Sequence, residues 1–226
     1  MKLLLGIDDA GRGPVIGPMI LAGCIIDEAT EKEFRSLGVR DSKQITPLRR
    51  EFLAKEIKKK SKSYKVISIS PEKIDTSSEK GLKLNELEAI ACAEIINYLN
   101  HGFSEKEKIK VVIDCPSTSI NKWTDFLKSH IDDLSNLEIS CEHKADRNHI
   151  SVSAASILAK SKREEEVEKL KKEFGEDMGS GYPSDPKTKK FLAKNKDNKR
   201  TSKIFRKSWK TWKEAVSKSK QKKLDF

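Results

Sequence analysis

The sequence has no long apolar run and no segment of the kind that sorts a protein to a membrane. Hydrophobic residues make up 36% of its 226 residues, and none of the apolar runs approaches the roughly 20 residues that a membrane-spanning helix needs. The chain enters an expected strand at Leu3, which leaves no room for a signal peptide. We therefore expect a protein that binds no membrane.

The chain has few cysteines, and their spacing does not match the usual patterns of metal ligands. The four cysteines are Cys24, Cys92, Cys115 and Cys141, and no two of them form a C-x-x-C pair. A zinc site or a disulfide framework is therefore not expected. Buried, reduced thiols are the ordinary alternative and are typical of cytoplasmic proteins, so we expect the protein in the cytoplasm. The chain also has no internal repeats.

Acidic residues are in short supply in one part of the chain, its last third. The formal net charge is +11. Residues 1–150 carry 24 basic and 24 acidic side chains, whereas residues 151–226 carry 22 basic and 11 acidic ones. A merely solvated surface does not require charge that is so one-sided. The asymmetry favours a polyanion as partner, and nucleic acid is the polyanion that we expect.

The opening stretch, Leu3 to Pro18, reads LLLGIDDAGRGPVIGP. Its short apolar run is typical of a buried strand, and Asp8 and Asp9 stand where that run ends. Carboxylates beside an apolar run are costly to bury unless a cation compensates them, and a divalent metal with oxygen ligands is the simplest such cation. Gly11 and Gly13 then form a loop whose N–H groups can approach a ligand closely. The alternative is an ordinary turn, because Asp and Gly are common turn residues.

Short apolar or alternating runs predict four further strands, at residues 18–26, 64–70, 109–113 and 137–142. Asp114 directly follows the run at 109–113, and Asp146 comes shortly after the run at 137–142. Ligand sites of parallel α/β sheets lie at the carboxyl ends of the strands. If the first and fourth strands are parallel neighbours, Asp8 and Asp114 meet at one point. Because four acids follow strand ends in this way, we prefer a metal site to a turn.

Helices are predicted for residues 46–60, 84–99 and 123–131, from Ser151 onward and after Pro186. The apolar stripe of the second of these helices consists of Leu84, Leu87, Ala91, Ile95 and Tyr98.

The segment GSGYPSDP forms a rigid loop that displays Tyr182. This side chain either stacks on a base or sugar or anchors the loop in the core, and the residues leave both alternatives open. Trp209 and Trp212 stand three residues apart. We expect them to anchor a helix to the body of the protein.

Taken together, these motifs resemble those of the type 2 ribonucleases H (ribonuclease HII), most closely the archaeal and eukaryotic branch. The resemblance rests on GIDDAGRGPVIGP, RDSK, LNELEA, VVIDCP, KADRNHISVSAASILAKSKRE, GSGYPSDPKT and RKSWKT, which occur in the family's order. It implies an α/β fold with a ribonuclease H-like mixed five-stranded sheet flanked by helices and a C-terminal helical segment. The implied activity is endonucleolytic hydrolysis of the RNA strand of RNA–DNA hybrids, and cleavage 5′ to ribonucleotides embedded in duplex DNA. The products would carry 3′-hydroxyl and 5′-phosphate ends.

The resemblance also implies roles for individual residues. The catalytic and metal-binding carboxylates would be Asp8, Asp9, Asp114 and Asp146. They would hold Mg²⁺ or Mn²⁺ in a two-metal site, in which ions roughly 3.5–4 Å apart orient the attacking water and stabilise the leaving oxygen. The substrate-binding residues would be Gly11, Arg12 and Gly13 at the ribonucleotide 2′-hydroxyl, Tyr182 at the sugar of the RNA–DNA junction, and Lys43 and Ser151 at phosphates.

One position departs from the family pattern, which has Glu where this chain has Asp9. The side chain is shorter by one methylene, roughly 1.5 Å of reach, whereas coordination distances are usually fixed to within about 0.2 Å. The charge is kept and the geometry changes. An alternative function is therefore a hybrid-binding protein with weak or no turnover. A phosphatase for small substrates also fits the acids, but it leaves the basic last third unexplained.

The expected organisation has three parts: a catalytic domain at 1–175, a basic helical substrate-binding segment at 176–216, and a flexible basic tail at 217–226. The tail resembles, with shortened spacing, the peptide by which replication and repair proteins dock on the sliding clamp; the matching residues are Gln221, Leu224 and Phe226. The alternative is a disordered charged tail without such a role. We expect a monomer whose partners are RNA–DNA hybrid and ribonucleotide-containing duplex DNA, with the clamp as a further partner if the tail docks on it.

Overall fold

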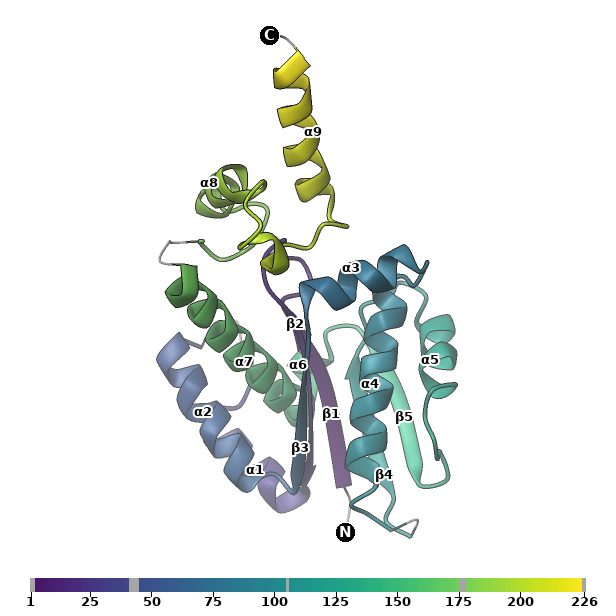
Figure 1. The fold of residues 1–226 in the computed structure, drawn as a ribbon. Coiled ribbons are helices and arrows are strands. Elements are labelled where there is room, and N and C mark those ends of the chain that lie inside the picture. Colours follow the sequence, from purple (N-terminus) through teal and green to yellow (C-terminus); the bar gives the residue numbers. More distant parts are fainter. Residues whose placement is uncertain (1–2, 41–44, 105, 175–177, 225–226) are drawn as a thin grey trace. The chain divides into compact units, whose positions relative to one another are not determined.

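The computed structural model of the chain describes residues 3–40, 45–104, 106–174 and 178–224, with the backbone alone for residues 218–224. Figure 1 shows its helices and strands. In chain order, the elements are β1 (Leu3–Ala10), β2 (Met19–Asp27), α1 (Glu28–Ser36), α2 (Pro47–Lys60), β3 (Ser63–Ile69), α3 (Pro71–Glu79), α4 (Leu84–Asn100), β4 (Ile109–Asp114), α5 (Ile120–Lys128), β5 (Leu137–Glu142), α6 (Ala145–Asn148), α7 (Ile150–Phe174), α8 (Pro186–Asn195), the 3₁₀ turn η2 (Ser202–Ile204) and α9 (Lys210–Leu224).

A mixed sheet of five strands, in the order β3-β2-β1-β4-β5, lies at the centre of the fold. β1 pairs antiparallel with β2, from Leu3 opposite Asp27 to Ala10 opposite Ile20. β1 also runs parallel to β4, and β4 runs parallel to β5. The predicted α/β fold with a mixed five-stranded sheet is confirmed, and so is the antiparallel pairing of the first two strands.

Helices cover both faces of the sheet (Figure 1). On one face, alternate side chains of β2 pack against α1, α2 and the first half of α7. The core on this face includes Ile20, Ala22, Cys24, Ile26, Phe34, Leu53, Ile57, Ala154, Ile157 and Leu158. On the other face lies α4, with α5 beside it, and Trp123 of α5 donates its Nε1–H to the carbonyl oxygen of Asn85 at 2.8 Å. Every residue of β2 is buried, which explains the continuous apolar sequence of this strand.

Local capping explains where several helices begin. Thr46 caps α2 and Pro47 occupies the first helical position, as predicted. Three helices, α1, α3 and the short α6, were not predicted from the sequence. Asp27 caps α1 through its side chain, and Ser70 caps α3 with Pro71 at the first helical position. The signal for α3 is the same kind of signal as that for α2, but it directly follows a strand and was not read as a helix start.

The apolar stripe predicted for α4 is correct in its middle; Leu84, at its start, is half-buried, and its C-terminal end is exposed. Leu87, Ala91 and Ile95 are buried. Tyr98 is 55% exposed, and its ring lies 4.0 Å from Lys65 Nζ. A tyrosine has an amphipathic side chain that can cover an alkyl-ammonium group at the surface, so helical spacing alone does not decide its burial.

The chain divides into two compact units. The first comprises Met1–Ala10, Ile20–Ile67 and Leu84–Lys162, and the second comprises Gly11–Met19, Ser68–Lys83 and Arg163–Phe226. This division differs from the boundaries expected from the sequence, because residues 11–19 and 68–83 join the C-terminal part. Helix α7 contributes to both units.

The second unit has its own apolar core. This core consists of Val15, Ile16, Met178, Phe191, Leu192, Ile204 and Phe205. Trp209 and Trp212 pack against it, and the rings of Trp212 and Phe205 lie 5.0 Å apart between their centroids. The prediction that the two tryptophans anchor a helix is confirmed.

Helix α9 continues to Leu224, so the backbone of residues 217–224 differs from the expected flexible tail. Lysine, which makes up half of this stretch, is a good helix former. The side chains of Gln221 and Leu224, and the whole of Phe226, lie outside what the structure describes. Among the described residues, no helix has the length and apolar character to cross a membrane.

Candidate active site

Two parallel strands bring the first three predicted acids to one edge of the sheet. Residues of β1 and β4 stand in register up to Ile7 opposite Ile113. Asp8 and Asp114 are the next residues along these strands, and Asp114 is the last residue of β4. Asp8 is buried and Asp9 is half-buried, as expected for neighbours that point to opposite faces of a strand. The predicted meeting of the first and fourth strands at their acids therefore holds.

A tight turn brings the fourth acid to the same edge. Lys144 has a left-handed backbone, with φ of 58°, and the short helix α6 begins directly after it. Its second residue, Asp146, is 5% exposed. The backbone N–H of Ala145 donates to Oδ1 of Asp114 at 3.3 Å, which ties α6 to the end of β4.

The carboxylates are close enough to change one another's acidity. The pKa of Asp8 is raised to about 8, first because the side chain is buried and then because Asp9 and Asp114 carry negative charge. A hydrogen bond from the Ser156 side chain and another from the Asp9 N–H, at 2.7 Å, act in the opposite direction. Burial also raises the pKa of Asp114, and the charge of Asp146 adds to that shift. Four carboxylates thus share a region of concentrated negative charge.

These residues fit a hard divalent cation by their chemistry. All four donors are carboxylates, which suit Mg²⁺ and Mn²⁺, and no thiol or imidazole is among them. A cation would also offset the repulsion and burial that raise the pKa of Asp8. Within the described residues, however, no three acidic, histidine or cysteine side chains are already gathered tightly around one point. The fit therefore rests on donor type and mutual electrostatics, not on a preformed coordination shell.

The Gly11–Gly13 loop belongs to the second unit. Side chains that are distant in sequence donate hydrogen bonds to its carbonyl oxygens. Gly11 has φ of 77°, in the left-handed region that favours glycine. The guanidinium of Arg206 donates to the carbonyl oxygens of Gly11 at 2.6 Å and of Arg12 at 2.8 Å. Trp209 Nε1 donates to the carbonyl oxygen of Gly13 at 3.1 Å. The carbonyl groups of the loop are therefore fixed by the protein itself.

Tyr182 stands beside this loop. Its side chain is 45% exposed, so the alternative of a tyrosine anchored in the core is wrong. The ring atom Cε1 lies 3.4 Å from the position that a Cβ atom on Gly13 would occupy. Gly13 thus leaves room for an aromatic ring at the surface next to the loop.

The other two residues that the sequence analysis placed at the substrate are Lys43 and Ser151. Lys43 lies outside the described residues. Ser151 is 3% exposed, and a Cβ atom on Gly6 would come within 2.1 Å of its backbone carbonyl carbon. Helix α7 therefore begins in direct backbone contact with β1, and the burial of Ser151 argues against its contact with a phosphate.

Sequence reasoning missed three side chains that support these elements: Ser156, Arg163 and Arg206. Ser156 is fully buried and bonds Asp8, but in the sequence it is one of several small residues in a helix. Arg163 and Arg206 are 7% and 0% exposed. In a chain segment so rich in basic residues, nothing local distinguishes a buried arginine from a solvated one.

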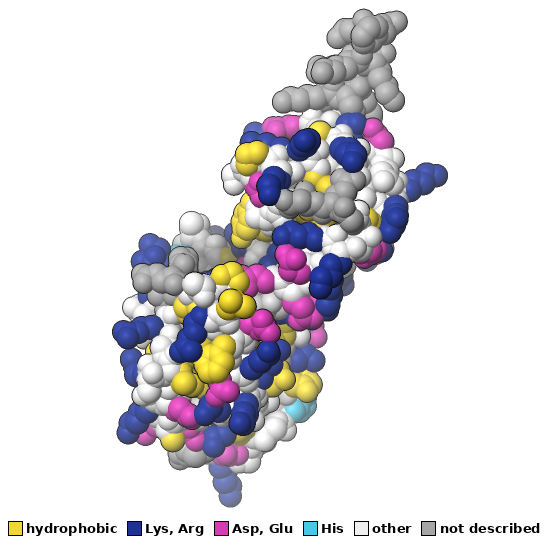
Figure 2. Space-filling model, turned by 90° about the vertical axis from the view of Figure 1, so that its left-hand side faces the viewer, with side chains coloured by type: hydrophobic (Ala, Val, Ile, Leu, Met, Phe, Trp, Pro, Cys, Tyr) yellow, Lys and Arg dark blue, Asp and Glu magenta, His cyan; other side chains and the backbone are white. Residues whose placement is uncertain are grey.

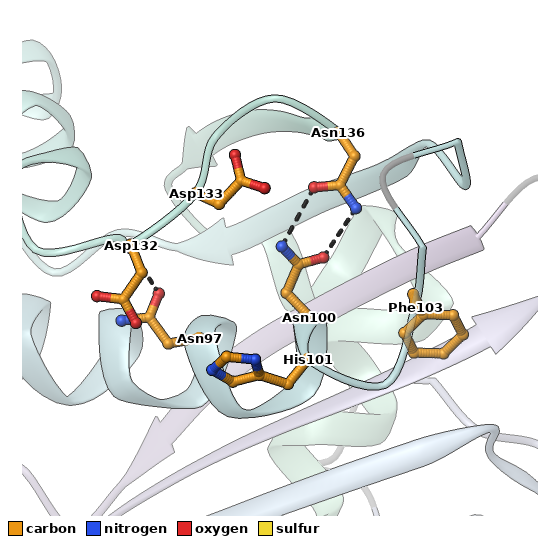
Figure 3. A pocket seen from close by; sticks show the side chains of 7 residues that line it. All are labelled: Asn97, Asn100, His101, Phe103, Asp132, Asp133 and Asn136. Carbon is orange, nitrogen blue, oxygen red and sulfur yellow. Dashed lines mark hydrogen bonds between the residues drawn. The ribbon is translucent and has the colours of Figure 1, made fainter.

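A pocket at the other end of the strands is part of the fold's own hydrogen bonding (Figure 3). It is lined by Asn97, Asn100, His101, Phe103, Asp132, Asp133 and Asn136. Asn100 and Asn136 exchange two side-chain hydrogen bonds, at 3.1 and 2.9 Å. Asn97 accepts a hydrogen bond from the N–H of Asp132 at 3.1 Å. The amides are thus used in joining α4 to the approach to β5, and we assign this pocket no role.

Basic side chains are spread over the face of the molecule that Figure 2 shows. Figure 2 shows Lys and Arg side chains on one face of the molecule, with acidic and apolar side chains between them. They are not collected into one patch on the face shown. This face therefore marks no single groove for the polyanion partner that the charge asymmetry of the sequence predicts.

Comparison with protein families and curated proteins gives consistent matches over almost the whole chain. A family model described as Ribonuclease HII matches residues 5–212. A ribonuclease HII from Methanococcus maripaludis strain C6 is 43% identical over 224 residues, which cover 99% of this chain and 91% of the relative. A ribonuclease HII from Pyrococcus furiosus is 42% identical over 207 residues, covering 91% and 88%.

Solved structures also match this chain over most of its length. The ribonuclease H2 of Pyrococcus horikoshii OT3 superposes with a TM-score of 0.83 at 36% identity, covering 96% of this chain and 98% of that one. The structure of a PCNA:RNase HII complex from Archaeoglobus fulgidus matches with a TM-score of 0.78 at 38% identity, covering 92% and 95%. An RNase HIII, Bst-RNase HIII, in complex with Mn²⁺ has a TM-score of 0.83 at 20% identity over 97% of this chain and 71% of that one, a likeness of fold alone.

Proposed function

The chain belongs to the ribonuclease HII family, and we propose that it cleaves on the 5′ side of ribonucleotides embedded in duplex DNA, leaving 3′-hydroxyl and 5′-phosphate ends. Family membership makes it a metal-dependent endoribonuclease with ribonuclease H activity on RNA–DNA hybrids. The finer proposal concerns the position of the cut and the residues that select it. The position of the cut rests on the resemblance of the motifs, and the observation that carries the catalytic centre is the parallel register of β1 and β4, which sets Asp8 beside Asp114.

In the proposed mechanism, Asp8, Asp9, Asp114 and Asp146 hold two divalent ions, Mg²⁺ or Mn²⁺. When bound, such ions supply an activated water for in-line attack and stabilise the leaving 3′-oxygen. The protein's part is to keep the carboxylates at one sheet edge. Ser156 and the Asp9 N–H orient the Asp8 carboxylate, and the Ala145 N–H orients that of Asp114.

Selectivity for ribonucleotides is proposed to lie in the loop Gly11–Gly13 and in Tyr182. The 2′-hydroxyl is the group that distinguishes RNA from DNA, and the backbone at Gly11 and Gly13, which have no side chain, can approach it closely. Arg206 and Trp209 hold the carbonyl groups of this loop, which supports a fixed reading surface. Tyr182 is exposed beside Gly13, where its ring can pack on the sugar at an RNA–DNA junction.

The alternative function, a hybrid-binding protein with weak or no turnover, depends on Asp9. Its shorter side chain carries the charge of the family glutamate with less reach. Asp9 is half-buried at the same edge as Asp8 and contributes to the raised pKa of that residue. Its charge thus acts on the site, and membership of a nuclease family supports catalysis over binding alone.

A cleavage assay decides between these two functions. The substrate is a DNA duplex with a single ribonucleotide, labelled at the 5′ end and incubated first with Mg²⁺ and then with Mn²⁺; the all-DNA duplex is the control. We expect one product that ends in a 3′-hydroxyl one position before the ribonucleotide. Binding without cleavage in both metals would support the alternative, and cleavage on the 3′ side would contradict the proposed position.

We also propose that the C-terminal tail docks on a sliding clamp. The residues concerned are Gln221, Leu224 and Phe226. Support comes from their likeness to clamp-binding peptides and from the Archaeoglobus fulgidus relative, whose structure is titled a PCNA:RNase HII complex. A tethered enzyme would have a raised effective concentration on newly replicated DNA without any change in its active site.

A further inference from the structure

Arg163 is a buried arginine in the second unit whose role the proposed mechanism does not include. It lies in α7 and is 7% exposed. Its guanidinium donates from Nη1 to the carbonyl oxygen of Pro18 at 3.0 Å and from Nη2 to that of Ile16 at 2.6 Å. Burial lowers its pKa to about 10, and the group still carries its charge at neutral pH. A buried, forked donor of this kind fixes the geometry of the groups that it bonds.

Three glycines surround this side chain, and each has a positive φ. A Cβ atom on Gly11 would come within 2.8 Å of Arg163 Cδ, one on Gly17 within 2.4 Å of Nη1, and one on Gly181 within 3.1 Å of Nη2. Their φ angles are 77°, 80° and 83°. Gly11 and Gly17 lie in the loop before β2, whereas Gly181 directly precedes Tyr182. Arg163 is therefore the side chain against which both loops are packed.

The two loops are also joined directly at Gly181. Its carbonyl oxygen accepts hydrogen bonds from the N–H groups of Val15, at 2.8 Å, and Ile16, at 3.4 Å. Its own N–H donates to Oγ1 of Thr188 at 3.0 Å. The backbone that leads into Tyr182 is thus fixed relative to residues 15–16, and Arg163 bonds the carbonyl oxygen of the same Ile16.

We propose that Arg163 is a positioning residue that sets the separation between the Gly11–Gly13 loop and Tyr182, and thereby determines preference for a single ribonucleotide followed by DNA. This inference rests on the proposed function of the loop and of Tyr182. A single embedded ribonucleotide offers one 2′-hydroxyl and one junction sugar, so both contacts must be made at once. A continuous RNA strand offers many positions and tolerates a changed separation better.

The first test replaces the guanidinium group of Arg163, which donates two hydrogen bonds, and keeps the positive charge. Arg163→Lys is compared with Arg50→Lys, because Arg50 is also buried and donates to a backbone carbonyl, that of Ile45, at 2.8 Å. The ratio of kcat/KM for a single-ribonucleotide duplex to kcat/KM for an all-RNA/DNA hybrid is measured for each. A displacement of about 1 Å can cost on the order of 100-fold in rate, and we expect this ratio to fall at least about tenfold in Arg163→Lys. It should not change in Arg50→Lys.

The second test disturbs the packing around Arg163 by a substitution at Gly181, so that the arginine itself is unchanged. Gly181→Ala places a methyl group against Arg163 Nη2 and the Ile16 carbonyl oxygen. Gly81→Ala is the matched control, because Gly81 has a φ of 84° and nothing within 4 Å of the added atom. In both variants the alanine stands at nearly the same left-handed φ, 83° and 84°. Only Gly181→Ala should lower the ratio, and this pair decides the question if Arg163→Lys does not fold.

The outcomes separate this inference from the function on which it rests. If the parent chain does not cut the single-ribonucleotide duplex, the proposed function fails before Arg163 is tested. If the parent cuts it and Arg163→Lys or Gly181→Ala lowers both rates equally, the arginine has only a structural role and the inference is overturned.

Discussion

Asp114 and Ala145 are joined by a hydrogen bond, in which the N–H of Ala145 donates to Oδ1 of Asp114 at 3.3 Å. The bond connects the last residue of β4 to the first residue of α6, and the next residue of α6 is Asp146. The carboxylate of Asp114, at the end of β4, therefore helps to position Asp146, the acid that follows β5. Two of the four proposed metal ligands are coupled in this way.

Asp114→Asn should nearly abolish cleavage while leaving hybrid binding largely intact. The amide can still accept the hydrogen bond from Ala145, but it removes the negative charge that a divalent ion requires. Cleavage and binding are measured on the same single-ribonucleotide duplex. The control is Asp125→Asn, at an exposed position of α5, which should change neither. Undiminished activity in Asp114→Asn would remove this residue from the site.

Asp9→Glu should raise the rate in Mg²⁺ or lower the Mg²⁺ concentration needed for half-maximal rate. The longer side chain restores the reach of the family glutamate, by roughly 1.5 Å. Titration of the rate with Mg²⁺, and separately with Mn²⁺, checks this expectation. A Glu variant that is no better than the parent in either metal would show that the argument from reach is wrong.

Tyr182→Ala should impair cleavage at a single ribonucleotide without changing the salt dependence of binding. Stacking contributes roughly 1–3 kcal/mol and releases no counterions. The control is Tyr64→Ala, because Tyr64 is exposed to a similar extent, 39% against 45%, and lies on β3. A changed salt slope with unchanged cleavage would assign Tyr182 a structural role instead.

Asp27 should make the stability of the protein depend on acid. Hydrogen bonds from Lys62, whose Nζ lies 2.9 Å away, and from Thr30 hold the pKa of this carboxyl far below its usual range. A lowered native pKa contributes stability that is present above the unfolded pKa of about 4 and is lost as the pH falls. Asp27→Ala should therefore cost about 1–2 kcal/mol at pH 7, and the cost should shrink at pH 3.

The matched control for Asp27 is Thr46→Ala. Thr46 caps α2 by accepting a hydrogen bond from the Arg49 N–H at 3.3 Å, but it carries no charge. Its removal should cost a similar amount at both pH values. Urea unfolding at pH 7 and pH 3 measures both variants, and equal pH dependence in the two would contradict a charged contribution from Asp27.

Removal of the last six residues should abolish binding to the host's sliding clamp. Calorimetric titration of the clamp compares the full chain with a chain that ends at Lys220. Equal affinities, or no binding by either, would contradict the docking proposal. Activity on free duplex should be nearly the same for both, because residues 221–226 carry none of the proposed catalytic groups.

The sequence by itself determined the parts that depend on local pattern. The five strands, the cap of α2 and the anchoring role of the two tryptophans follow from short-range periodicity and capping chemistry, and each is confirmed. The position of Asp8 and Asp114 at one edge was also predictable, since the acids follow strands that proved to be parallel neighbours.

Only the tertiary structure decided which side chains hold those parts in place. Arg163 bonds carbonyl groups 145 and 147 residues away, and Arg206 bonds the Gly11 carbonyl 195 residues away. A basic residue in a basic segment looks the same whether it is solvated or buried. The same limit applies to Tyr98 and Ser151, because burial depends on what the rest of the chain packs against a position, which no local pattern records.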